Sequence, residues 1–175
     1  MNYNSSKYKE FYEIISDIAE NPTIQEMKNY RQHYNSSCFD HCFSAAYYCF
    51  CICKKLKLDY KSATRAAMVH DLFLYDWRVK DTNRKGIHAF KHPIIAYEKA
   101  SKLFKINKKE KDIILKHMWP VTIIPPKYLE SYILTLVDKY SALEEGYNYY
   151  KEKVISKKFL RYASMFLLIF FIHIP

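Results

Sequence analysis

The sequence predicts an all-α protein with a single domain, on the evidence of its turn residues and its length. Its 175 residues include only two glycines and six prolines. All-β sandwiches and barrels need such residues at every tight turn, so the low content favours helices. The length suffices for one sizeable core but is below the length at which cores usually divide. We therefore expect one helical bundle.

Helical segments joined by short polar loops are expected along the whole chain. The first two cover residues 8–19 and 23–30, and Pro22 between them suits a helix start. A third segment follows a polar stretch and reaches Lys55; because it is apolar nearly all round, we expect it at the centre of the bundle. Asp59 is the expected N-cap of a fourth segment, which reaches Leu74.

The second half of the chain begins with a predicted loop at residues 76–89, the most polar stretch of the middle. Pro93 suits the first position of the helix that follows this loop. Asn107 and Glu110 form a predicted capping box at the start of the next one. The remaining segments are expected at residues 93–104, 107–117, 128–145 and 149–172.

We divide the chain into N-terminal helices at residues 1–32, a central domain at 33–146 and a C-terminal helix at 147–175. This last helix is basic over residues 151–161 and then continuously apolar over 165–172. Eight apolar residues cannot span a bilayer, which needs about twenty. The segment is expected either to pack over the domain or to make peripheral contact with an anionic membrane.

The formal net charge of +10 favours anionic partners, such as phosphorylated metabolites, nucleic acid or an acidic membrane surface. Lysines that merely solvate helix faces would give the same charge. The N-terminus lacks the apolar run of a secretory signal, so we expect a cytoplasmic protein with free cysteines. Four cysteines share one helical stripe and are expected as small core residues rather than zinc ligands: Cys38, Cys42, Cys49 and Cys53.

Four polar side chains stand out because they lie in apolar surroundings. The pair His70 and Asp71 is flanked by apolar residues on both sides, and Asp138 follows the apolar residues 133–137. A buried carboxylate without a partner is costly. His41 lies near the start of the central apolar segment. Each residue alone fits a hydrogen-bonded core position, but the four together indicate ligands of a divalent metal, of which Mn, Fe, Zn, Co and Ni suit imidazole with carboxylate.

The ordered pattern of His41, the pair His70 and Asp71, and then Asp138 resembles the signature of the HD-domain superfamily, over about residues 33–145. The resemblance implies an HD-type helical bundle with a central metal site. It also implies phosphohydrolase activity on nucleotides or other phosphate esters in most members.

Two further histidines extend the resemblance to HD proteins that bind two metal ions. His92 and His117 occur in the order in which those proteins place extra ligands, and their equivalent of Asp71 bridges the ions. The resemblance therefore implies one ion at His41, His70, Asp71 and Asp138, and a second at Asp71, His92 and His117. The alternatives are a helix-start role for His92 and a helix-end cation for His117.

Asp71 and Asp40 are the expected catalytic residues. Asp40, beside the first ligand, would orient that ligand or accept a proton, and an N-cap role is the equal alternative. Arg78, Lys91 and Lys139 are candidates for binding substrate phosphate. The phosphate-binding lysine that some HD branches carry shortly after the HD pair is absent from residues 72–75. The substrate of any one HD branch therefore cannot be assigned to this chain.

The expected function is hydrolysis of a phosphate ester or anhydride of a small molecule, and dinucleoside polyphosphate hydrolysis is one reaction of this type. An HD-type di-iron oxygenase is the enzymatic alternative, because some HD proteins use the same positions to activate oxygen. A non-catalytic nucleotide- or RNA-binding module is the third class. Only net charge supports it, and no aromatic RNA-binding motif occurs. A nucleic-acid partner is therefore not expected.

Overall fold

The computed structural model describes residues 6–79 and 86–172, with side chains as far as residue 154. The described residues contain helices and no strands beyond an isolated bridge between Arg31 and Ser37. The all-α prediction is confirmed. The elements are α1 (Ser6–Ala19), α2 (Pro22–Gln25), the 3-10 helix η1 (Glu26–Asn29), α3 (Cys38–Lys55), α4 (Tyr60–Val69), α5 (His88–Leu103), α6 (Lys108–Lys116) and α7 (Leu129–Ile172).

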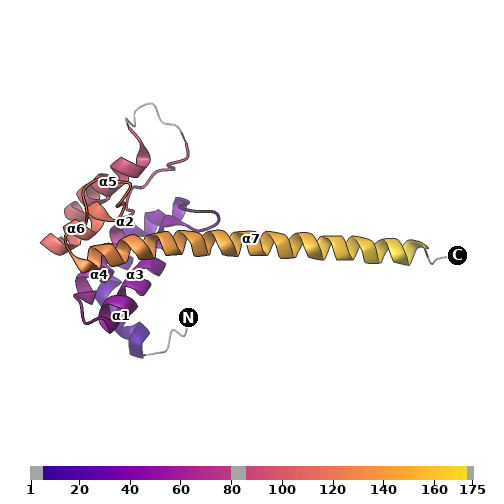
Figure 1. The fold of residues 1–175 in the computed structure, drawn as a ribbon, viewed down its shortest axis with the longest axis horizontal. Coiled ribbons are helices and arrows are strands. Elements are labelled where there is room, and N and C mark those ends of the chain that lie inside the picture. Colours follow the sequence, from indigo (N-terminus) through magenta and orange to yellow (C-terminus); the bar gives the residue numbers. More distant parts are fainter. Residues whose placement is uncertain (1–5, 80–85, 173–175) are drawn as a thin grey trace.

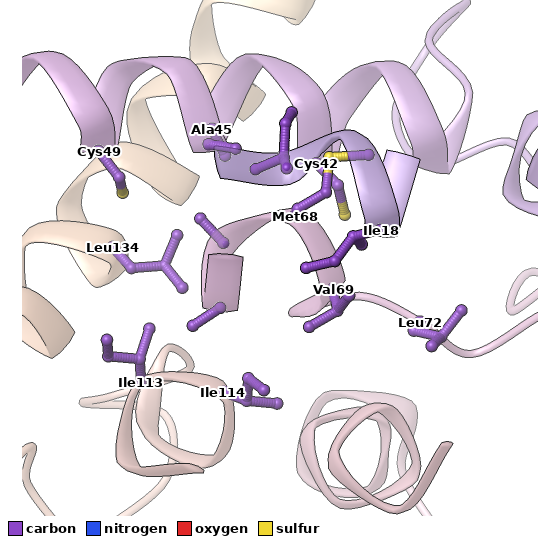
Figure 2. Close-up of a cluster of buried hydrophobic side chains, with 14 of the residues drawn as sticks. Ile18, Cys42, Ala45, Cys49, Met68, Val69, Leu72, Ile113, Ile114 and Leu134 are labelled. Carbon is purple, nitrogen blue, oxygen red and sulfur yellow. The ribbon is translucent and has the colours of Figure 1, made fainter. Parts of the chain in front are cut away.

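The hydrophobic core lies where α3 and α4 meet the remaining helices of the bundle. Figure 2 shows side chains of this core, among them Ile18 of α1, Met68 of α4 and Leu134 of α7. The four cysteines predicted as core residues are buried and unpaired, which confirms that prediction. Their small side chains let α3 approach its neighbours closely.

Capping side chains fix where the helices begin. Ser37 accepts a hydrogen bond from the backbone N–H of Asp40 and starts α3. Asp59 accepts one from Ser62 and starts α4, as predicted. The predicted capping box of Asn107 and Glu110 is present at the start of α6. Each cap satisfies backbone donors that have no partner within the helix.

Two helix boundaries differ from the sequence prediction, and both differences affect the candidate site. Helix α4 ends at Val69 instead of continuing to Leu74, so His70 is its C-cap and Asp71 follows the helix. Helix α5 begins at His88, so Pro93 lies inside it and does not open it. The ring of His88 stacks on Trp77, 5.4 Å between centroids. This packing outweighs the local preference of proline for a first turn.

Helix α7 is continuous from Leu129 to Ile172, where two segments were expected. Gly146 lies within it and faces Tyr34 so closely that a Cβ would come within 2.9 Å of the ring. In Figure 1 the C-terminal half of α7 extends away from the other helices. The expected packing of this half over the domain is therefore not seen. No helix among the described residues combines the length and the apolar content needed to cross a membrane.

Candidate metal centre

The structure brings the first four predicted ligands together inside the bundle. His41 comes from α3, His70 and Asp71 from the end of α4, and Asp138 from α7. One ligand atom from each lies within 4.8 Å of the others. His41 Nε2 is 3.0 Å from Asp138 Oδ1, and His70 Nε2 is 3.6 Å from the nearest oxygen of each aspartate. The set has the composition of a divalent metal site.

A second group shares Asp71 with the first. His92 comes from α5 and His117 from the C-cap of α6. Asp71 Oδ1 lies 3.1 Å from His92 Nε2 and 3.5 Å from His117 Nε2, and the two imidazole nitrogens are 2.8 Å apart. All three side chains are buried. Oδ1 of Asp71 therefore faces His92 and His117, and Oδ2 faces His70 of the first group.

All four histidines are oriented by an acceptor at the other ring nitrogen. His70 Nδ1 is 2.8 Å from the carbonyl oxygen of Ala67, and equivalent backbone bonds hold His92 and His117 at 3.0 and 2.8 Å. A carbonyl oxygen only accepts, so the proton is assigned to Nδ1. The ring atom directed at the cluster is then Nε2, the atom available to an ion.

The imidazole nitrogens and carboxylate oxygens of the two groups fit a bound cation. Two imidazole nitrogens 2.8 Å apart need a proton or a cation between or beside them. His70 Nε2 and Asp71 Oδ1 are buried and have no hydrogen-bond partner in the described part of the chain. Buried acceptors are costly without a partner. The mixture of imidazole and carboxylate suits Mn, Fe, Co, Ni or Zn.

The charges within the cluster also favour a bound cation. Burial raises the pKa of Asp71, but His70 and His92 outweigh it and hold that pKa well below its usual range. Burial likewise raises the pKa of Asp138, but the hydrogen bond from His41 and the nearby charge of His70 outweigh it and lower that pKa. Burial lowers the pKa of His41, yet bonds to Asp138 and Glu145 raise it well above its usual value. Two ionised carboxylates thus demand positive charge at the centre, which protons or metal ions supply.

Two polar residues of the cluster were not predicted from the sequence. Glu145 Oε1 accepts from His41 Nδ1 at 2.9 Å. The spacing in the sequence could have indicated Glu145, because this residue lies two helical turns after Asp138 on the same face of α7. Gln32 donates a hydrogen bond through Nε2 to Asp71 Oδ2. Gln32 is buried in the loop before α3, and nothing in that polar stretch of sequence marks it.

Asp40, predicted to assist His41, lies outside the cluster. Its side chain is exposed, and its carboxylate accepts a hydrogen bond from the Ser37 hydroxyl at 2.6 Å. It lines a separate groove with Tyr12 and Phe43. Adjacent helical residues point about 100° apart, which directs Asp40 away when His41 faces inward. The alternative N-cap role belongs to Ser37 instead, and Asp40 is an acidic residue of the first turn of α3.

A pocket of about 410 Å³ opens onto both metal-ligand groups. Its lining includes Asp71, His92, His117 and Asp138. Apolar and imidazole side chains also line it, from the loop before α3, the segment between α4 and α5, the start of α5, the turn after α6, and α7: His33, Trp77, Ile87, His88, Met118 and Ala142. The pocket is large enough for a small molecule.

Of the three predicted phosphate-binding cations, only Lys139 lines this pocket. Its ammonium donates to the carbonyl oxygens of Trp119 and Thr135, each at 3.1 Å, and to that of His117 at 3.5 Å, and burial lowers its pKa. Arg78 instead pairs with Asp76 at 2.6 Å on an exposed turn. Lys91 is exposed, and its aliphatic chain lies against Gly86. The predicted roles of Arg78 and Lys91 are therefore not supported by their positions.

The fold and the cluster define a class: an all-α protein with two buried His/Asp groups that share one aspartate. The comparison with protein families agrees, since the HD domain matches residues 38–143, more than half of the chain. The chain belongs to the HD domain family. No curated protein and no solved structure matches it.

Proposed function

We propose that the chain is a metal-dependent phosphohydrolase that acts on a phosphate ester or anhydride of a small molecule. The observation that carries the proposal is the sharing of Asp71 by two ligand groups next to one pocket. Paired metal sites of this kind serve phosphoryl transfer in many enzymes. Membership of the HD domain family supports the same reaction class.

We assign one ion to His41, His70, Asp71 and Asp138, and a second to Asp71, His92 and His117. Divalent ions bound there would act as Lewis acids on a phosphoryl oxygen and would lower the pKa of a bound water. Asp71 is the residue that both ions share. Its lowered pKa keeps it ionised, and the hydrogen bond from Gln32 fixes its orientation.

The chain's own groups bind and orient the substrate. Lys139 places a positive charge in the pocket wall, held by three carbonyl oxygens, and that charge would attract a substrate phosphate. Trp77 and Met118 give the pocket apolar surface that excludes water around the substrate. The net charge of +10 favours the approach of anions.

The test combines metal analysis with a phosphate-release screen. The chain is purified without added metal, its ions are counted, and nucleotides and simple phosphate esters are offered as substrates. The proposal expects bound transition metal and phosphate release that a chelator removes. Asp40→Ala serves as a matched control, because this carboxylate lies beside His41 in sequence but outside the cluster.

The same six ligands would also suit two iron ions, which keeps the di-iron oxygenase as the second candidate. The two functions differ in what the reaction consumes. Oxygen uptake without phosphate release, in an iron-containing preparation, would replace the phosphohydrolase by the oxygenase. Release of phosphate under anaerobic conditions would exclude oxygen as a reactant.

A further inference from the structure

Helix α7 carries a stripe of exposed apolar side chains that its own bundle covers only in small part, where Tyr48 packs against Tyr140 and Tyr34 against Tyr150. The six residues are between 52% and 74% exposed. We call them the α7 stripe, and they are Leu136, Tyr140, Leu143, Tyr147, Tyr150 and Val154. Large exposed apolar patches usually mark an interaction site.

The spacing of the stripe identifies the kind of partner. Successive members are four and three residues apart in strict alternation, and Leu129, also exposed, lies one heptad before Leu136. This is the pattern that a helix presents to a second helix in a left-handed coiled coil. The stripe lies on the face of α7 opposite to Asp138, because the two are about half a turn apart around the helix. A partner helix would therefore leave the metal groups undisturbed.

We propose that the α7 stripe binds the α7 stripe of a second copy of this chain, with the two helices antiparallel. Charge decides the direction. A parallel pair would bring the basic residues 151–161 of both copies together. An antiparallel pair separates them and sets Glu144, which flanks the stripe, opposite Lys151 on the same edge of the partner helix. Symmetry forms this pair twice.

The same register pairs members of the stripe with one another. With Tyr147 across from Tyr150 of the partner helix, Leu143 falls across from Val154. These four residues surround the two-fold axis, so each copy buries part of the other copy's stripe, including Leu143, its most exposed member.

Molar mass of the full chain in solution is the first test. Sedimentation velocity over a range of concentrations should give a species of twice the chain mass of 21.1 kDa. Leu143→Glu places a charge in the middle of the stripe and should convert the dimer to monomer. Asn148→Glu is the matched control, because Asn148 is exposed on α7 but lies outside the stripe, and it should leave the dimer intact. Circular dichroism verifies that both variants keep their helices.

Charge reversal tests the direction. Glu144→Lys and Lys151→Glu should each weaken the dimer severalfold, and the double variant should restore it. A parallel pair would not recover, since these positions do not face each other in that arrangement. The proposal is overturned by a wild-type chain that stays monomeric at every concentration, by a dimer that tolerates Leu143→Glu, or by a monomer that instead sediments with vesicles of anionic lipid.

Discussion

Glu145 offers a sensitive test of the metal centre, because it touches no ion in the assignment and acts through His41. Its Oε1 accepts from His41 Nδ1 at 2.9 Å, which holds the ring with Nε2 toward Asp138. Removing a carboxylate that orients a metal-binding histidine typically weakens metal affinity by about 10- to 100-fold. Glu145→Ala should therefore cost roughly 1.4–2.8 kcal/mol of binding free energy for the ion at His41.

The assay is competition for metal against a coloured chelator, carried out on the folded chain. Glu145→Gln keeps an acceptor for His41 Nδ1 and should lose less than about tenfold in affinity. Glu144→Gln is the matched control: this neighbouring carboxylate accepts from Tyr48 at 2.9 Å and does not reach the cluster. If Glu145→Ala binds metal as tightly as the wild type, the orienting role of Glu145 is refuted.

Three further predictions concern the same centre. Asp71→Ala should abolish metal binding and phosphate release while circular dichroism shows the helices retained; a folded variant with its full metal content would remove Asp71 from the site. Lys139→Met should raise KM for a phosphate substrate by about tenfold with a smaller change in kcat, and an unchanged KM would exclude phosphate binding by Lys139. Metal binding should release protons, because burial lowers the pKa of His41 and His70 but their charged neighbours raise it above its usual value. Both rings are then protonated below that raised pKa, so apparent affinity should rise with pH. Titration calorimetry in buffers of different ionisation enthalpy measures the release, and its absence would contradict the assigned charges.

Much of the centre was predictable because ionisable residues in apolar sequence are conspicuous. His70, Asp71 and Asp138 interrupt runs that otherwise form the core, and the structure brings them together. Glu145 follows Asp138 at helical spacing but sits in a charged stretch, where a carboxylate attracts no notice. Gln32 had no local signal, since its contact with Asp71 depends on how the loop before α3 folds back.

The errors of prediction arose where distant contacts decide local structure. Pro93 favours a helix start, but α5 begins earlier, at His88, whose ring stacks on Trp77. The choice among the candidate cations also depends on distant contacts, because charge alone does not say which of them faces the pocket. Lys139 lines the pocket from α7, whereas Arg78 turns back to its neighbour Asp76. The charge of Arg78 is then satisfied locally.

If two ions share Asp71, one of them depends on His92 and His117. Counting the metal in the His92→Ala/His117→Ala double variant tests this arrangement. We expect about two ions per wild-type chain and about one in the variant, with the helices retained, because the ligands of the first ion are untouched. Elemental analysis at equal protein concentration gives both values. If the two proteins hold equal amounts of metal and the variant only loses stability, these histidines are structural. That result would exclude a second ion at Asp71, His92 and His117.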